Sequence, residues 1–111
     1  MPTGSVQGRR VAVTGLGVVA SCGVGPDAFW AGLNGPPPEG ERRVADWDPS
    51  PWFDKPKDAR RTDRFAQFAL AGAAMALEQA GSLPYDPSRI GTWIGTGVGG
   101  IATLEEQINI N

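Results

Sequence analysis

The sequence predicts an α/β fold with parallel strands, and three observations lead to this prediction. A β-branched run closed by glycine spans residues 10–15, and a second run of this kind spans 89–95. A long amphipathic helical pattern lies between them over 57–80. Strands that alternate with helices are typical of a parallel sheet. Two parallel strands cannot cover their own faces, so we expect the chain to be the front of a larger fold.

The N-terminal part is expected to contain a flexible end, a turn region and a helix. Residues 1–9 are small and polar and are predicted to be flexible. Several glycines after the first strand indicate a close-packed turn region that ends at Gly25. A helix is predicted to begin at Pro26, because proline has a fixed φ and Asp27 lies beside the positive end of the helix. Asn34-Gly35 predicts its left-handed stop.

An irregular stretch is predicted from Pro36 to about Pro56. Its aromatic residues, Trp47, Trp52 and Phe53, indicate a loop that is pinned onto the body of the protein.

The clearest predicted element is the helix over 57–80, which Gly81 ends. Small residues at 71–74 would let this helix approach a neighbour closely. A proline-containing loop, the second strand, a glycine-rich turn over 95–100 and a new helix from Ile101 follow. The residues of the apolar face recur at three- and four-residue spacing: Phe65, Phe68, Ala69, Gly72, Met75, Ala76 and Ala80.

Composition excludes several classes of function. The 111 residues hold 10 basic and 12 acidic side chains, so the net charge of −2 does not predict binding to nucleic acid or to an anionic membrane. The chain has no histidine, which removes the commonest general base and metal ligand, and we expect neither a metal nor a cofactor. The single Cys22 excludes an internal disulfide framework and suits a reducing, cytoplasmic location.

Two short patterns each have an ordinary structural explanation. Residues 15–20 follow the first strand and fit the start of a dinucleotide-binding fingerprint, but glycines and Pro26 interrupt the helix that the fingerprint needs, so a structural turn is favoured. Residues 9–22 are similar to a bacterial lipoprotein signal, with Cys22 as the lipidated residue. The alternative for Cys22 is a small buried hydrophobic residue.

A basic patch precedes the long helix. Lys57, Arg60, Arg61 and Arg64 fall on one side at helical spacing, at what the sequence predicts to be the N-terminal end of the helix. The helix dipole disfavours cations there, which favours an anionic partner. A solvated face, or partial neutralisation by the acidic residues over 39–54, remains the alternative.

Several segments together resemble the N-terminal part of elongating β-ketoacyl-acyl carrier protein synthases. The resemblance covers about residues 9–107 and roughly the first quarter of such an enzyme. It implies a thiolase-like fold with α/β/α/β/α layers, usually as a homodimer, with residues 10–111 as the N-terminal segment of the synthase domain. The stretch over 34–54 looks shorter and richer in proline than is usual in the family. The segments are Arg10–Val19, Phe29-Trp30, Ala59–Gln67, Ile94–Gly100 and Leu104–Gln107.

The resemblance also implies a decarboxylating Claisen condensation in fatty acid or polyketide biosynthesis. The family's catalytic cysteine and two histidines are expected after Asn111, so residues 1–111 alone are expected to be inactive. A non-catalytic relative of the chain-length-factor type would share this front end. By position, Lys57, Arg60 and Arg61 match residues that dock the acyl carrier protein and its phosphopantetheine. Val98 matches a residue of the acyl pocket near the dimer interface.

Overall fold

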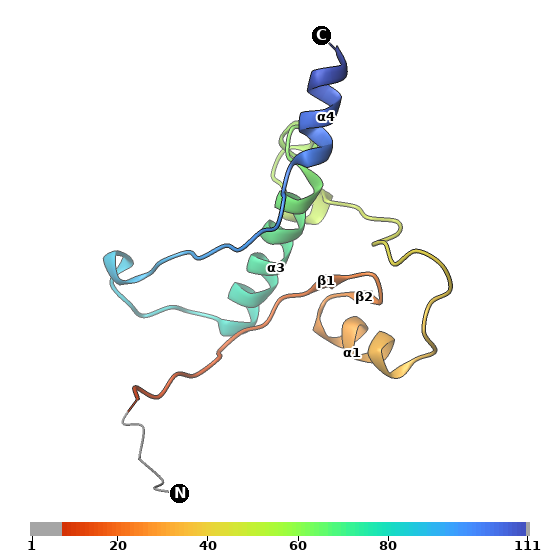
Figure 1. Ribbon diagram of the computed structural model, residues 1–111. Helices are drawn as coiled ribbons and strands as arrows, with labels where there is room; N and C mark the ends of the chain where they lie inside the picture. The colour runs from red at the N-terminus through yellow and green to blue at the C-terminus, as the bar shows by residue number, and fades with distance from the viewer. Residues whose placement is uncertain (1–7, 111) are drawn as a thin grey trace, which may run out of the picture.

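A computed structural model describes residues 8–110, and one long helix lies at its centre (Figure 1). The predicted flexible end falls largely outside the described residues. The helices are α1 (Pro26–Asn34), α2 (Pro56–Arg60), α3 (Arg64–Ala80) and α4 (Ile101–Ile110), with short 3₁₀ turns η1 (Ser50–Trp52) and η2 (Pro87–Arg89). The strands are β1 (Val19–Ala20) and β2 (Gly23–Val24).

The two strands form an antiparallel hairpin that leads into α1. Val19 pairs with Val24, and Ala20 pairs with Gly23. The helix begins at Pro26, as the sequence predicts. Its end differs from the prediction, because Gly35 has φ −87° and is extended rather than left-handed.

Neither predicted parallel strand forms within the described residues. Residues 10–15 are without regular structure and pair with no strand, and Val11 is 89% exposed. Residues 90–95 are also without regular structure, and Trp93 is 98% exposed. The prediction of two strands is wrong here because an extended segment becomes a strand only when its backbone pairs with another. Figure 1 shows the two segments on separate paths, with no strand beside either of them.

The glycines of the dinucleotide-like pattern serve packing. A Cβ at Gly15 would overlap the carbonyl of Ala76, and a Cβ at Gly17 would overlap that of Gly72. The backbone N–H of Leu16 also donates a 2.6 Å hydrogen bond to Oε1 of Gln79. The glycine-containing segment therefore lies directly on the small-residue face of α3, which confirms the close approach predicted for that face.

The predicted helix over 57–80 is two helices. The first ends at Arg60, and the second begins at Arg64 after a non-helical Asp63 with φ −55° and ψ 147°. The hydroxyl of Thr62 donates a 2.7 Å hydrogen bond to the carbonyl of Asp58, and its N–H bonds the carbonyl of Ala59 at 3.2 Å. Side-chain hydrogen bonds of this kind compete with helix continuation. The far end agrees with the sequence, since Gly81 has φ +74° and ends α3.

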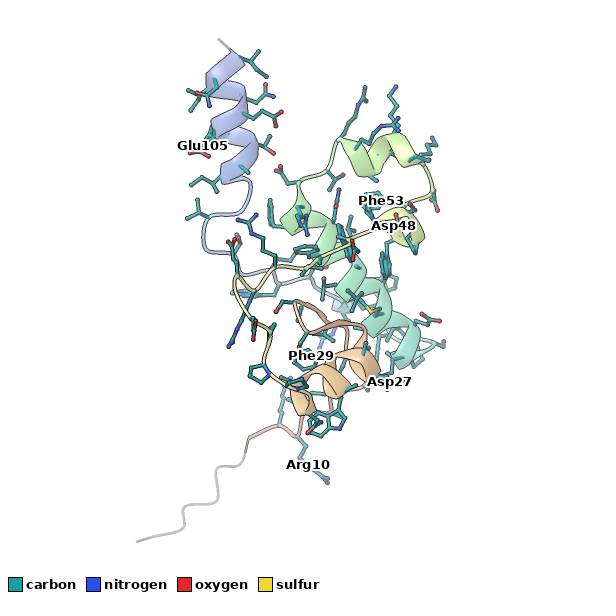
Figure 2. The ribbon with its side chains drawn as sticks, turned by 90° about the vertical axis from the view of Figure 1, so that its right-hand side faces the viewer. Arg10, Asp27, Phe29, Asp48, Phe53 and Glu105 are labelled. Carbon is teal, nitrogen blue, oxygen red and sulfur yellow. The ribbon has the colours of Figure 1, made fainter. Side chains whose placement is uncertain are left out.

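The aromatic loop is pinned to α3, as predicted. Trp47 stacks on Trp52 with ring centroids 5.2 Å apart, and it makes a T-shaped pair with Phe68 whose ring centroids are 4.9 Å apart. Stacked and edge-to-face pairs are both favourable arrangements of aromatic rings. Figure 2 shows Asp48 and Phe53 on this segment, which passes beside α3. The loop therefore fixes the start of α3 in place.

The described chain buries very little. Only Ala59 and Ala71 are buried among residues 8–110. The radius of gyration is 18.2 Å, against about 13 Å for a compact domain of this length. The accessible surface is 9802 Å², against about 5,900 Å² for a compact protein of this mass. Within residues 8–110, the secondary structure thus consists of helices and one small sheet arranged around α3.

Candidate functional site

The basic cluster, which we define as Lys57, Arg60 and Arg61, lies on and just after α2. All three side chains are exposed, and within residues 8–110 none of them forms an ion pair. Lys57 and Arg60 belong to the last turn of α2, where the helix dipole favours cations. The inference that the dipole opposes these charges is therefore wrong, because the helix ends among them.

Arg64 is separated from the basic cluster. Its guanidinium lies 5.3 Å from the centroid of the Phe68 ring and donates a hydrogen bond to the carbonyl of Val44. Arg64 opens α3, so the break between the two helices turns it toward the aromatic loop. Its role here is to hold that loop, and the predicted set of four cations on one side is reduced to three.

Among the described residues, no acidic side chain over 39–54 forms an ion pair with the basic cluster. Glu41 pairs with Arg43 at 2.8 Å, and this hydrogen bond and the nearby positive charge lower the pKa of Glu41. Asp48 accepts hydrogen bonds from the hydroxyl and N–H of Ser50, which lower the pKa of Asp48. Glu41 and Asp48 are thus engaged within their own segment and not with the basic cluster.

Gln67 positions α2, and the sequence analysis did not single it out. Its Nε2 donates to the carbonyls of Ala59 at 2.8 Å and Thr62 at 3.0 Å. Its Oε1 accepts from Nε1 of Trp47 at 2.8 Å. One amide therefore holds the end of α2, the start of α3 and the aromatic loop together. No local sequence signal marks this role, because all three partners are set by the fold.

Val98 lies in the glycine loop, which we define as residues 96–100, and is 70% exposed. The loop rests on the start of α3, because a Cβ at Gly99 would lie 2.6 Å from the ring of Phe65. Val98 and Phe65 line a shallow pocket of about 210 Å³. The branched side chain thus stands at the edge of a partly apolar pocket.

A cleft of about 310 Å³ joins the basic cluster to α4. Arg60 and Arg61 form one side of it, and Thr103 and Glu106 lie on the other. Asp63 lies between them and accepts a hydrogen bond from the hydroxyl of Thr103. The structure thus brings two of the three predicted carrier-binding residues, Arg60 and Arg61, into one cleft with α4, the helix that follows the glycine loop.

Cys22 lies in the turn between β1 and β2 and is half-buried. Its Sγ is 3.9 Å from the carbonyl oxygen of Phe29, which accepts its weak hydrogen bond. Across the described part of the chain, no group of three or more His, Cys, Asp or Glu side chains could hold a metal ion. In residues 8–110, no helix has the length and apolar character needed to cross a bilayer.

Comparison with known proteins gives the family. The model of the β-ketoacyl synthase N-terminal domain matches residues 37–110, which is more than half of the chain. The chain therefore belongs to the β-ketoacyl synthase family, of which it carries N-terminal domain sequence. This confirms the resemblance drawn from the sequence. No solved structure matches the chain.

Individual relatives come from both fatty acid and polyketide synthesis. A Streptomyces halstedii protein named as polyketide β-ketoacyl synthase 1 is 40% identical over 115 residues, covering 89% of this chain and 27% of the relative. The 3-oxoacyl-[acyl-carrier-protein] synthase 2 of Synechocystis is 34% identical over 125 residues, covering 96% of this chain and 29% of the relative. A Streptomyces coelicolor protein named as actinorhodin polyketide β-ketoacyl synthase 1 is 35% identical over 116 residues, covering 89% of this chain and 25% of the relative. The chain thus spans about a quarter of the length of these relatives.

Proposed function

We propose that the chain is the leading segment of an elongating β-ketoacyl-acyl carrier protein synthase with a thiolase-like layered fold. The family match over residues 37–110 is the observation that carries this proposal. The relatives named as 3-oxoacyl-[acyl-carrier-protein] synthases support it, as do those named as polyketide synthases. The complete enzyme would act in the cytoplasm, as a homodimer, in fatty acid or polyketide synthesis.

The proposed reaction is a decarboxylating Claisen condensation. An acyl group is held as a thioester on an enzyme cysteine. The bond between the malonyl carbon and its carboxylate breaks, carbon dioxide leaves, and the electron pair stays on that carbon. The carbanion then attacks the thioester carbonyl, a carbon–carbon bond forms, and the cysteine thiolate departs. Because this chain contains no histidine, the catalytic histidines of such an enzyme would lie outside it.

In this proposal the basic cluster binds the acyl carrier protein. Three exposed cations without ion pairs among the described residues suit an acidic protein surface and the phosphate of phosphopantetheine. Val98 would limit the depth to which the acyl chain enters its pocket. The branched side chain occupies space that glycine would leave open, which supports this role.

The test is a condensation assay with the full-length protein, acyl-carrier protein and malonyl-carrier protein. We expect carbon dioxide release and a β-ketoacyl product two carbons longer than the donor. A full-length protein that yields no product would contradict the proposal. Product that appears only after a second ketosynthase subunit is added, with the acyl thioester on the cysteine of that second subunit, would assign this protein the non-catalytic partner role instead.

A further inference from the structure

The carboxylate of Asp63 links two features of the proposed function. Asp63 immediately precedes α3, where an aspartate usually caps the helix with its side chain, yet it makes no such hydrogen bond. Its Oδ1 instead accepts a hydrogen bond from the hydroxyl of Thr103, forty positions along the chain and in the first turn of α4. The side chain thus contributes to tertiary positioning rather than to its own helix.

The same carboxylate lies against the backbone of the glycine loop. A Cβ at Gly100 would lie 3.0 Å from Oδ2 of Asp63, and the φ of Gly100 is +76°, a conformation that favours glycine. Together with the contact of Gly99 on the Phe65 ring, this fixes the C-terminal end of the loop to the start of α3. Val98 is the next residue toward the N-terminus, so its position depends on these contacts.

Asp63 also borders the basic cluster. It lines the same cleft as Arg60, Arg61 and Thr103. A carrier protein held by the basic cluster would therefore lie beside the hydrogen bond that holds the glycine loop. Glu106 lines the same cleft from α4. Asp63 differs from it because it precedes α3 and reaches α4 through the hydroxyl of Thr103.

We propose that Asp63 is a positioning residue for the acyl pocket. Its hydrogen bond with Thr103 holds the glycine loop at a fixed place relative to the basic cluster, and this sets which acyl chain lengths the synthase accepts. Hydrogen bonds to a charged carboxylate are among the stronger ones in proteins, so the loss of this bond frees the loop. The inference rests on the proposed function.

The test changes the donor of this bond in the full-length synthase. Thr103→Val removes the hydroxyl with little change in shape, whereas Thr103→Ser keeps it. We measure kcat and KM for a series of carrier-bound acyl donors of increasing length. With Thr103→Val, the ratio of kcat/KM between long and short donors should shift by about tenfold. The KM for each carrier-bound donor should stay within about twofold of the wild-type value. Thr103→Ser, which keeps the hydroxyl, should show the wild-type ratio.

Asp58→Asn is the matched control, because it removes a carboxylate from α2 near the same arginines without touching α4. An equal shift in this control would show that the ratio responds to any change around α2 and not to the bond with α4, which would overturn the inference. Hydrogen–deuterium exchange over residues 96–100 tests the contact without any activity. It should be faster in Thr103→Val, and unchanged exchange would overturn the inference. Absence of condensation by the wild type contradicts the proposed function, and the exchange result still decides whether Asp63 holds the loop.

Discussion

Arg60 and Arg61 are adjacent guanidinium groups at the end of a five-residue helix, and both are exposed. Neither of these guanidinium groups forms an ion pair within the described chain. In contrast, Arg43 pairs with Glu41, and Arg64 contacts Val44 and Phe68. A charge that has no intramolecular partner is available to another molecule. This difference separates Arg60 and Arg61 from Arg43 and Arg64.

Reversing these two charges should weaken carrier binding. In the full-length synthase, Arg60→Glu with Arg61→Glu should lower the affinity for acyl carrier protein by about tenfold or more, because like charges would then face each other. Binding of a free acyl thioester should change little. The control Arg42→Glu with Arg43→Glu reverses the same number of charges outside α2. Equal loss for the carrier and the free thioester, measured by calorimetry, would argue against docking.

Gly17 lies where no side chain fits. Gly17→Ala should lower the free energy of unfolding of the full-length protein by about 1–3 kcal/mol, because a Cβ would overlap the carbonyl of Gly72 and force the segment away from α3. Gly91→Ala is the control, since no atom lies within 4 Å of a Cβ there. Denaturant unfolding measures both changes, and equal effects would contradict the packing role of Gly17.

The break between α2 and α3 is the main difference from the sequence prediction, which gave one helix over residues 57–80. Residues 57–64 carry one apolar side chain, Ala59, and neither glycine nor proline, so the pattern contains no signal for a break there. The break is made by hydrogen bonds of Thr62 and Gln67, and it moves the basic cluster to a helix C-terminus. Helix α1 and the start of α4 were predicted well, because proline and glycine signals at those positions are local.

The side chain of Gln67 should contribute to the stability of the protein through its hydrogen bonds to α2 and the aromatic loop. Gln67→Glu keeps an acceptor for Trp47 but replaces the donor to the carbonyls of Ala59 and Thr62 with an acceptor. We expect a loss of about 1–3 kcal/mol in stability, faster amide exchange in α2 and weaker carrier binding.

The matched control for this change is Gln79→Glu on the other end of α3. It adds the same charge while keeping an acceptor for the N–H of Leu16. Amide exchange in α2 should stay at the wild-type rate in this variant. Faster exchange in both variants would show that the added charge, and not the lost donor, loosens α2.

The molecule as a whole is open around α3, and its large apolar side chains are mostly exposed. We expect the isolated 111-residue chain to give no condensation product, because it contains no histidine and its one cysteine lies in the β1–β2 turn. By small-angle scattering its radius of gyration should be near 18.2 Å. A value of about 13 Å would show a compact domain instead, and turnover by this chain would contradict the assignment of the catalytic residues elsewhere.

The sequence by itself determined the family, the helices with local start and stop signals, and the presence of a basic cluster. These follow from residue types and short spacings, which can be read without knowing any distant partner. Only the tertiary structure decided which cations stay free, where the long helix breaks, and that Asp63, Gln67 and Thr103 tie the site together. The tertiary structure also decided that residues 10–15 and 89–95 do not form strands, because strand formation depends on a partner and not on the segment alone.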